Sequence, residues 1–325
     1  MNNYNFNNKK ILFFGIGFYD YDEHIKQKLE ELGAQVTYMS QYPNLSKTEY
    51  IKKKIIKDYE IKILTNYYEK IINNLDSGYD YVFVIKGEFI PLWFMKELKD
   101  KLKKTTFILY QWDSIKRLNN YFELSNYFDR ILTFDRLDAL RYNITFRPLF
   151  FKDLYLNKNI TSSIKKYDIY FSGYLHSDRY SLIQKIYNYN LNLHLYIRKL
   201  EFIKLQVLNI IKFKKIFDSR LVSYSSINDE KNKNNMISSI AVLDIHHPDQ
   251  SGLTIRTIES IATGNKVITT NKDIVNYEFY NKSNIFIVDR GNMIIDKDFF
   301  NIPMIKYENI NYYSLDSWVK DIFEL

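Results

Sequence analysis

The stretch DQSGLTIRTIE, residues 249–259, carries side chains that could bind a phosphorylated ligand. It follows an apolar run, and a helix is expected to begin at Ser251 or Gly252. Free N–H groups at a helix start bind anions, and glycine allows close approach to the backbone. Arg256 would oppose the helix dipole there unless an anion such as a diphosphate were bound. Glu259, one turn further on, could accept both hydroxyls of a ribose.

The same residues also have a simpler explanation. Ser251 would be an ordinary N-cap, and Arg256 and Glu259 would form an i, i+3 ion pair on the surface. Either way, the isoleucines of this helix fall on one side and form its buried stripe. Gly264 follows as a helix stop.

A second loop of this kind, YFSGYLHSDR at residues 170–179, follows another apolar strand. Gly173 would let a phosphate approach the chain, and His176 and Arg179 would contact it where a helix begins near Ser177. The alternative is a plain βα turn that Ser177 caps. Both loops therefore predict an anion site, with a structural explanation left open for each.

A metal site is not expected in this chain. His246 and His247 are adjacent, and neighbouring residues at a strand end point to opposite sides. The chain has no Cys and only five His, so no set of zinc ligands is evident. We expect one histidine of the pair, His247, at a bound phosphate or sugar, and the other in a structural role.

The first half of the chain carries acid–base candidates in FFGIGFYDYDEH, residues 13–24. Gly15 and Gly17 follow the first strand, but the third glycine of a dinucleotide fingerprint is missing, so NAD binding has little support. The side chains that crowd this loop, any of which could act as a general base, are Asp20, Asp22, Glu23 and His24. Helix capping by Asp20 or Asp22 is the alternative.

Two more strand ends in the first half carry polar side chains. LYQWDSIKR, residues 109–117, places Trp112 where it could stack on a sugar. Asp113 could stabilise charge or orient a second substrate, or it could only cap the next helix. IKGEF, residues 85–89, adds Glu88 as a weaker candidate.

Apolar runs of four to six residues alternate with amphipathic stretches, which is typical of parallel βαβ units. Helices are expected at 22–32 and 91–101, the latter with Pro91 as its first residue. The strands are expected at 11–14, 35–38, 81–85, 106–110, 130–133, 167–173, 191–196, 239–245, 266–269 and 284–288.

The segment 147–166 interrupts this alternation with Pro, Asn, Ser and Thr, so we place a domain boundary there. The expected domains are 1–150 and 151–313, with a C-terminal helix at 314–325 that packs back on the first. Ligands of open α/β sheets lie beyond the carboxyl ends of the strands, where the candidate loops also lie.

Composition narrows the class of protein. With 325 residues, 46% hydrophobic, the chain can bury two cores. The charge of +8 comes from basic residues that are spread along the chain among nearly as many acids, without a basic arm or an RNA-binding signature, so nucleic-acid binding is not expected.

The chain lacks a signal-peptide core and a membrane-span window, and the absence of Cys fits a cytoplasmic location. Residues 198–217 form a basic amphipathic stretch that could rest on anionic lipid, although a solvated helix face is the alternative.

The loops at 170–179 and 246–271, together with YQWDSI in the first half, resemble bacterial glycosyltransferases that build surface polysaccharide, of the CgeB-like and group 1 types. The resemblance implies an α/β fold with two Rossmann-like doubly wound domains facing across a cleft, the GT-B fold. It also implies that Glu259 binds the donor ribose, while Gln250, Ser251, Gly252 and Leu253 contact the diphosphate and sugar. The group 1 pair of glutamates is incomplete, because Ser251 or a neighbour stands where the first is expected.

The resemblance implies transfer of a sugar from a nucleotide diphosphate donor to a glycan or lipid-linked acceptor in capsule or lipopolysaccharide synthesis. We expect donor binding on the second domain by Gly173, His176, Arg179, His247, Arg256 and Glu259. Asp113, His24 and Asp22 are the catalytic candidates, and Gly17, Glu88 and Trp112 lie on the acceptor side. No cofactor or metal is expected. Contact with the inner face of the plasma membrane is expected. The alternatives are a nucleotide-sugar 2-epimerase and a non-catalytic lipid- or nucleic-acid-binding module.

Overall fold

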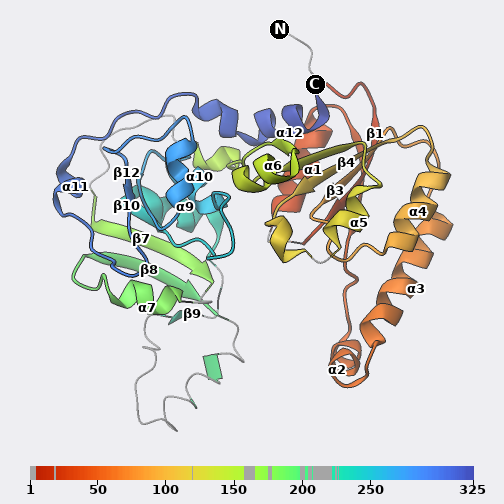
Figure 1. Cartoon of the computed structure of the whole chain (residues 1–325), viewed down its shortest axis with the longest axis horizontal. Coiled ribbons are helices and arrows are strands. Elements are labelled where there is room, and N and C mark those ends of the chain that lie inside the picture. Colours follow the sequence, from red (N-terminus) through yellow and green to blue (C-terminus); the bar gives the residue numbers. More distant parts are fainter. Residues whose placement is uncertain are drawn as a thin grey trace. The chain divides into compact units, whose positions relative to one another are not determined.

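The computed structural model divides into two compact units (Figure 1). Unit 1 comprises Met1–Pro148 with Leu315–Leu325, and unit 2 comprises Leu149–Ser314. The sequence-based boundary after residue 150 lies close to the change of unit at Pro148. The structure describes residues 5–17, 20–118, 120–156, 165–174, 178–197, 202–203, 207, 222–223, 225 and 227–325.

Unit 1 is built on a six-stranded sheet in which every pairing is parallel, in the order β2-β1-β3-β4-β5-β6. Strand β1 has β2 on one side and β3 on the other, so the topological switch point of this sheet lies between β1 and β3. The strands are β1 (Lys10–Gly15), β2 (Gln35–Ser40), β3 (Tyr81–Ile85), β4 (Thr106–Gln111), β5 (Arg130–Thr133) and β6 (Thr145–Phe146).

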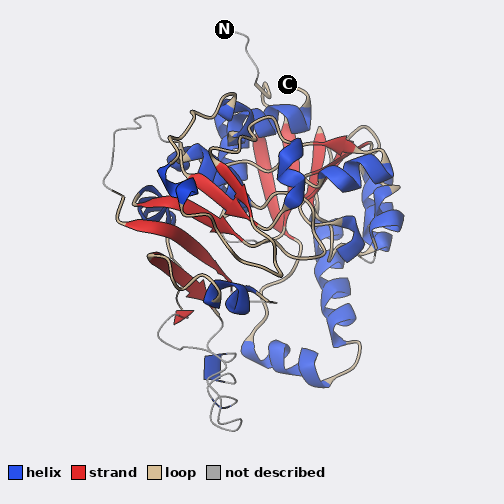
Figure 2. Ribbon diagram, turned by 60° about the vertical axis from the view of Figure 1, so that its left-hand side comes forward, coloured by secondary structure: helices blue, strands red, loops and turns tan. Residues whose placement is uncertain are grey.

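Helices cover both faces of this sheet (Figure 2). On one face, Phe14 and Leu109 pack with Tyr68, Phe94 and Leu124 in the main core of the unit. The helices of unit 1 are α1 (Tyr21–Glu31), α2 (Lys47–Ile55), α3 (Tyr59–Asn74), α4 (Leu92–Lys101), η1 (Ile115–Arg117), α5 (Tyr121–Ser125), α6 (Arg136–Tyr142) and α12 (Leu315–Phe323).

The last helix, α12, packs on the other face of the unit 1 sheet, beside α1. The Trp318 ring is fully buried and meets Tyr110 edge-on at 4.8 Å between centroids. Phe323 meets Phe83 in the same way at 5.3 Å. Arg130 donates to the Asp321 carbonyl at 2.7 Å. These aromatic contacts make α12 part of the unit 1 core.

Unit 2 has a second six-stranded parallel sheet, in the order β12-β11-β10-β7-β8-β9. Counted from β7 as the first strand of the unit, this is the 3-2-1-4-5-6 order of a Rossmann sheet, and its topological switch point lies between β7 and β10. The strands are β7 (Tyr167–Tyr174), β8 (Leu191–Tyr196), β9 (Val222–Ser223), β10 (Ser239–Asp244), β11 (Lys266–Thr269) and β12 (Ile285–Ile287).

One face of the unit 2 sheet packs Phe171 and Leu243 against Leu182, Ile183 and Phe299. On the other face α9 contacts β7 and β10, and α10 contacts β10 and β11. The helices are η2 (Asp153–Tyr155), α7 (Arg179–Gln184), α9 (Asp229–Ile237), α10 (Ile255–Ala262), η4 (Lys272–Asn276), α11 (Asp298–Asn301) and η5 (Ile310–Tyr313).

Every strand expected from the sequence is present, with bounds that differ by at most one or two residues, and the α/β class is confirmed. Two helix starts were wrong. Pro91 is the N-cap of α4 rather than its first residue. The helix expected from Ser251 or Gly252 begins at Ile255, because Thr254 is its N-cap and accepts a hydrogen bond from the Thr257 amide.

Most of the basic stretch 198–217, together with His176 and Ser177, lies outside the described residues. Among the residues that are described, no helix is long and apolar enough to cross a membrane.

Candidate functional site

The candidate anion site lies at the carboxyl ends of β7 and β10, the switch point of the unit 2 sheet. The β7 end contributes Ser172 and Gly173, and Arg179 opens the following helix. The β10 end contributes Asp244, and Arg256 lies in the first turn of α10. Ligands of open α/β sheets bind in the crevice that forms at such a point.

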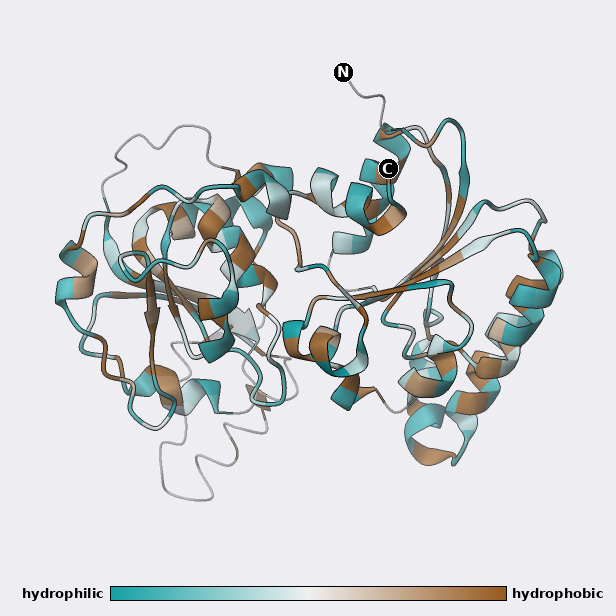
Figure 3. Cartoon of the chain, turned by 45° about the horizontal axis from the view of Figure 1, so that its top comes forward, coloured by the Kyte–Doolittle hydropathy of each residue, from teal (hydrophilic) through white to brown (hydrophobic). Residues whose placement is uncertain are grey.

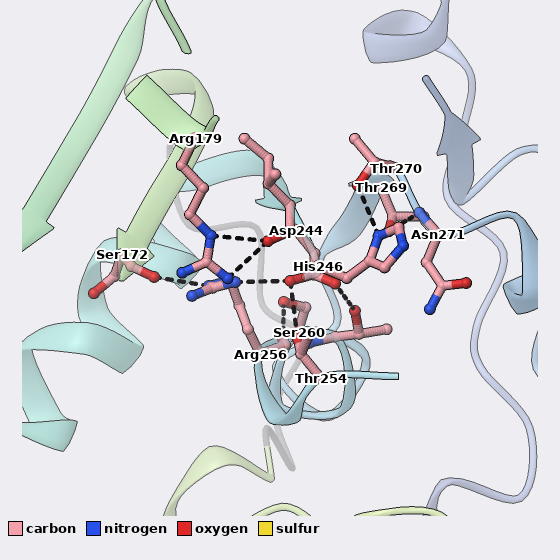
Figure 4. Close-up of polar contacts among 12 residues, drawn as sticks. Ser172, Arg179, Asp244, His246, Thr254, Arg256, Ser260, Thr269, Thr270 and Asn271 are labelled. Atoms are coloured by element: carbon pink, nitrogen blue, oxygen red, sulfur yellow. Dashed lines mark hydrogen bonds and ion pairs between the residues drawn. The ribbon is translucent and has the colours of Figure 1, made fainter. Parts of the chain in front are cut away.

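Asp244 organises the start of α10 (Figure 4). Its carboxylate is fully buried and accepts hydrogen bonds from the hydroxyls of Thr254 at 2.8 Å and Thr257 at 3.0 Å. It also pairs with Nη1 of Arg256 at 2.7 Å. A buried carboxylate is stable only with such partners. Asp244 therefore ties the strand end to the cap and first turn of the helix.

Arg256 is held by groups of the protein itself, whereas the sequence predicts a bound anion or Glu259 as its partner. Its Nε donates to the Ser172 carbonyl at 2.7 Å, and its guanidinium lies 4.8 Å from the centre of the Phe171 ring. A Cβ on Gly173 would come within 2.5 Å of Nη2. Gly173 thus makes room for an arginine of the protein itself. Nη2 makes no hydrogen bond to any residue that the structure describes.

Arg179 joins the ends of the two central strands. It is 7% exposed, and its Nε and Nη2 donate to the Ile245 carbonyl while Nη1 donates to the Tyr174 carbonyl at 2.9 Å. Burial lowers the pKa of Arg179 to about 9, and the positive charge of Arg256 adds to this effect. The side chain still carries its charge at neutral pH, close to a second cation.

A third arginine, Arg290, comes from the segment after β12. Its Nη1 lies 2.7 and 2.6 Å from the two carboxylate oxygens of Asp178, and its Nη2 donates to the His246 carbonyl. His246 bonds through Nδ1 to the Thr270 hydroxyl at 2.8 Å (Figure 4). Burial lowers the pKa of His246, so its ring is neutral at pH 7.

The loop before α10 is held from the neighbouring strand end. The buried Asn271 side chain donates to the Ser251 carbonyl at 2.8 Å and to the Gly252 carbonyl at 3.4 Å. Leu253 is 1% exposed and belongs to the core, whereas Gln250 is half-buried. These contacts fix the loop in a non-helical path, which explains why α10 begins later than expected.

His247 lies in the loop before α10, and Glu259 lies in α10 itself. His247 is half-buried, and its Nδ1 accepts a hydrogen bond from the Asp249 amide at 3.2 Å. Glu259 is 3% exposed, in the second turn of α10. Burial, and then the negative charge of Glu259, raises the pKa of Tyr155. The Glu259 carboxylate therefore lies close to Tyr155.

Three guanidinium groups gather at this edge. Those of Arg179, Arg256 and Arg290 lie around the carboxylates of Asp178 and Asp244. The third carboxylate of the site, that of Glu259, lies one turn further along α10. The N-terminus of α10 adds partial positive charge. Guanidinium groups beside a helix start provide the chemistry of a phosphate or diphosphate site.

In unit 1, Asp22 holds the loop after β1. It is 5% exposed and accepts hydrogen bonds from the Gly17 amide at 2.7 Å and the Tyr38 hydroxyl at 2.9 Å. A Cβ on Gly15 would come within 2.2 Å of this carboxylate. Burial raises the pKa of Asp22, and these hydrogen bonds oppose the rise. The Asp22 carboxylate therefore holds the loop after β1 against β2.

The other unit 1 candidates gather at the ends of β3 and β4. Lys86, in a left-handed conformation with φ 67°, lies 2.6 Å from Glu88 and 3.3 Å from Asp113. Arg117 pairs with the other oxygen of Asp113 at 2.9 Å. Asp113 is therefore held between two cations, and its side chain is 15% exposed.

Trp112 and His24 are the remaining unit 1 candidates. The Trp112 ring contacts Tyr110 and Tyr21 at centroid distances of 6.1 and 5.9 Å. His24 Nε2 lies 3.3 Å from a carboxylate oxygen of Asp20, and its side chain is 33% exposed.

Sequence reasoning missed three residues of the unit 2 site. Asp244 is the one charged residue of its strand, which was a usable signal because a buried carboxylate needs partners. Arg290 lies two residues after the strand region at 284–288, at a carboxyl end. Asn271 follows β11 in the same way, although nothing in the sequence indicates which loop it holds.

No protein-family model matches the chain, and no curated protein does. Solved structures do match over nearly the full length. Alpha,alpha-trehalose-phosphate synthase (UDP-forming) from Burkholderia xenovorans, in complex with glucose-6-phosphate, aligns with a TM-score of 0.61 and 8% identity over 97% of this chain and 99% of that one.

The apo structure of OtsA aligns with a TM-score of 0.59 and 11% identity, covering 98% of this chain and 99% of the other. Sucrose-phosphate synthase from Thermosynechococcus elongatus gives 0.51 and 10%, covering 97% and 94%. At these identities the similarity is one of fold. The chain therefore has the α/β fold of the GT-B glycosyltransferases, with two parallel sheets flanked by helices.

Proposed function

We propose that this chain is a glycosyltransferase that uses a nucleotide diphosphate sugar as its donor, and that the donor binds unit 2 between the ends of β7 and β10. The observation that carries the proposal is the grouping of three arginines at this switch point, next to the start of α10. The GT-B fold supports it, because the matched structures include a UDP-forming synthase.

In this proposal the diphosphate lies at the start of α10, within reach of Nη2 of Arg256, Nε2 of His246 and Arg290. Glu259 accepts the ribose hydroxyls one turn deeper, and His247 and Gln250 border the sugar. Fixed cations and the helix dipole stabilise the charge that develops on the leaving diphosphate. Positioning of the anomeric carbon supplies the rest, so the reaction requires no cofactor or metal.

The acceptor is proposed to bind unit 1, beyond the ends of β1, β3 and β4. Gly17 and Glu88 lie at the switch point between β1 and β3, and Trp112 offers a ring face for a sugar. Asp113 or His24 then receives the proton of the acceptor hydroxyl. We further propose that the acceptor is a glycan or lipid-linked sugar of capsule or lipopolysaccharide assembly.

A thermal-shift assay with UDP, GDP, CDP and ADP tests the donor site. A ligand at about 100 times its Kd stabilises a protein by about 2.7 kcal/mol, which raises Tm by about 5–10 °C for a unit of this size. We expect one nucleotide to give such a rise, and Arg290→Gln and Glu259→Gln to lose most of it. Arg141→Gln removes an exposed arginine of unit 1 and is the matched control. If no nucleotide raises Tm, the donor-site proposal is wrong.

Release of the nucleotide diphosphate from a nucleotide sugar tests the transfer. We expect release to depend on an added acceptor, and Asp113→Asn to lower kcat while leaving the nucleotide-induced rise in Tm unchanged. A 2-epimerase would instead convert the nucleotide sugar without any acceptor. Conversion of the nucleotide sugar alone would therefore favour that alternative over transfer.

A further inference from the structure

Helix α2 of unit 1 carries apolar side chains that the fold does not bury. It has no buried residue and lies beyond the end of α3 that points away from the sheet of its unit (Figure 1). Figure 3 shows apolar positions on this helix pair where it extends from the sheet. The exposed apolar side chains between residues 50 and 61 are Tyr50 (48%), Ile51 (55%), Ile55 (77%), Ile56 (48%) and Ile61 (63%).

The orientation of α2 follows from the contacts of Lys53. Its Nζ lies 2.6 Å from Glu60 and 4.9 Å from the centre of the Tyr42 ring, so this side of α2 faces the rest of unit 1. At about 100° per residue, Ile51 and Ile55 fall on the opposite side of the helix. Their exposure agrees with this direction. The two isoleucines therefore point outward from the unit.

Helix α3, the next helix in the chain, also carries an exposed apolar side chain. Its inner stripe packs on the sheet through Tyr68, Ile71 and Ile72. Ile61 lies two turns before Tyr68 on the same side of the helix, but beyond the region that the core covers, so 63% of it is exposed. Exposed apolar residues grouped in this way mark an interaction surface.

Lysines surround the exposed isoleucines. Of the six lysines between residues 47 and 62, Lys53 faces inward, and the exposed ones are Lys47, Lys52, Lys54, Lys57 and Lys62. Two of the three acids are engaged, because Glu49 forms a capping box with Ser46 and Glu60 pairs with Lys53. The Lys54 ammonium lies 4.5 Å from the centre of the Tyr50 ring. The outward side of α2 is thus apolar in the middle and cationic at the edges.

We propose that this surface, formed by Tyr50, Ile51, Ile55, Ile56 and Ile61 with the five exposed lysines, docks on an anionic phospholipid membrane. Apolar side chains enter the interface of the bilayer while flanking lysines bind anionic headgroups, and this charge complementarity selects lipid as the partner. Nucleic acid would leave the isoleucines exposed to water. A second copy of the chain would bring two sets of lysines together.

Co-sedimentation of the full chain with vesicles tests the proposal. One vesicle is phosphatidylcholine alone, and the other contains roughly a third phosphatidylglycerol. We expect binding to the second and little to the first. A lysine near an anionic surface contributes about five-fold, so Lys47→Gln with Lys52→Gln and Lys54→Gln should weaken binding about 100-fold. Ile51→Ser with Ile55→Ser should weaken it about ten-fold or more.

Matched controls alter the same residue types elsewhere on the chain. Lys96→Gln, Lys103→Gln and Lys104→Gln change the charge equally on another exposed part of unit 1. Ile294→Ser with Ile305→Ser changes two exposed isoleucines of unit 2. Both controls should bind anionic vesicles as the wild type does. All four variants should keep the wild-type Tm and the wild-type response to nucleotides, which separates this proposal from that of the donor site.

Binding that is equal in the α2 variants and the wild type would overturn the proposal and assign lipid contact to another segment, such as 198–217. Absence of binding to either vesicle would overturn it as well. Light scattering after size-exclusion chromatography tests whether a second copy of the chain binds this surface. A dimer that Ile51→Ser with Ile55→Ser converts to a monomer would show that a second copy, and not lipid, occupies this surface.

Discussion

The Asp244 carboxylate holds the start of α10, so its removal should destabilise unit 2. Asp244→Ala removes a fully buried carboxylate and its bonds to Thr254, Thr257 and Arg256. Breaking a buried ion pair costs about 3–5 kcal/mol, because the other charge remains buried without its partner. The Arg256 side chain is 14% exposed and recovers little hydration. We therefore expect unit 2 to lose about 4 kcal/mol of unfolding free energy.

The assay exploits the positions of the three tryptophans, Trp93, Trp112 and Trp318, which all lie in unit 1. Tryptophan fluorescence therefore follows the unfolding of unit 1, while far-UV circular dichroism follows both units. With a urea m-value of about 2 kcal/mol/M, a loss of 4 kcal/mol lowers the midpoint by about 2 M. We expect this change in the dichroism transition of unit 2 and a much smaller one in fluorescence.

The pairing with Arg256 can be separated from the hydroxyl contacts by a double-mutant cycle. If the ion pair carries the effect, Asp244→Ala together with Arg256→Ala should cost less than the sum of the single changes, by about 2 kcal/mol. A loss below about 1 kcal/mol for Asp244→Ala, typical of a surface substitution, would refute this account of the helix start.

Three further outcomes are expected. Gly173→Ala places a Cβ against Nη2 of Arg256. It should lower the free energy of unfolding by about 1–3 kcal/mol in the same urea assay and weaken nucleotide binding. Unchanged nucleotide binding would show that Gly173 is not part of the donor site. Burial lowers the pKa of His246. The stability that the neutral ring contributes is therefore present above the unfolded-state pKa of about 6.5 and is lost as pH falls through the lower folded-state pKa. His246→Gln should flatten this part of the pH profile of Tm, and a profile identical to that of the wild type would contradict the burial of a neutral His246. Ser46→Ala removes the capping box of α2, so amide exchange in α2 should quicken about five-fold with little change in global Tm, and equal exchange rates would show that the cap is not needed.

Strands were the most predictable part of this chain. Parallel strands buried on both faces are continuous apolar runs with polar ends, as in 106–111 and 266–269, and their limits are visible residue by residue. The short strands β6 and β9 lack such runs and were not foreseen. The exposed helix α2 was not foreseen either, because no buried stripe marks it.

The start of α10 could not be read from the sequence. Ser251 and Thr254 are both suitable N-caps, and the choice between them depends on Asn271, which holds the carbonyls of Ser251 and Gly252 from another loop. The partners of Arg256 were hidden in the same way. Ser172 lies 84 residues away in the chain, and only the parallel pairing of β7 and β10 brings its carbonyl to the guanidinium.

A cation in the first turn of a helix loses roughly 0.3–1 kcal/mol against the helix dipole. Asp244 offsets this loss for Arg256, and Asp178 pairs with Arg290, which lies in a loop, so neither arginine by itself requires a ligand. Arg179 is different, because it is 7% exposed and its described hydrogen bonds go to carbonyl groups alone. Buried cations are normally paired with an anion. Asp244 and Asp178 act on the Arg179 charge without forming an ion pair with it among the described residues. An anionic ligand at the switch point would supply a direct partner, which is why we place the diphosphate there.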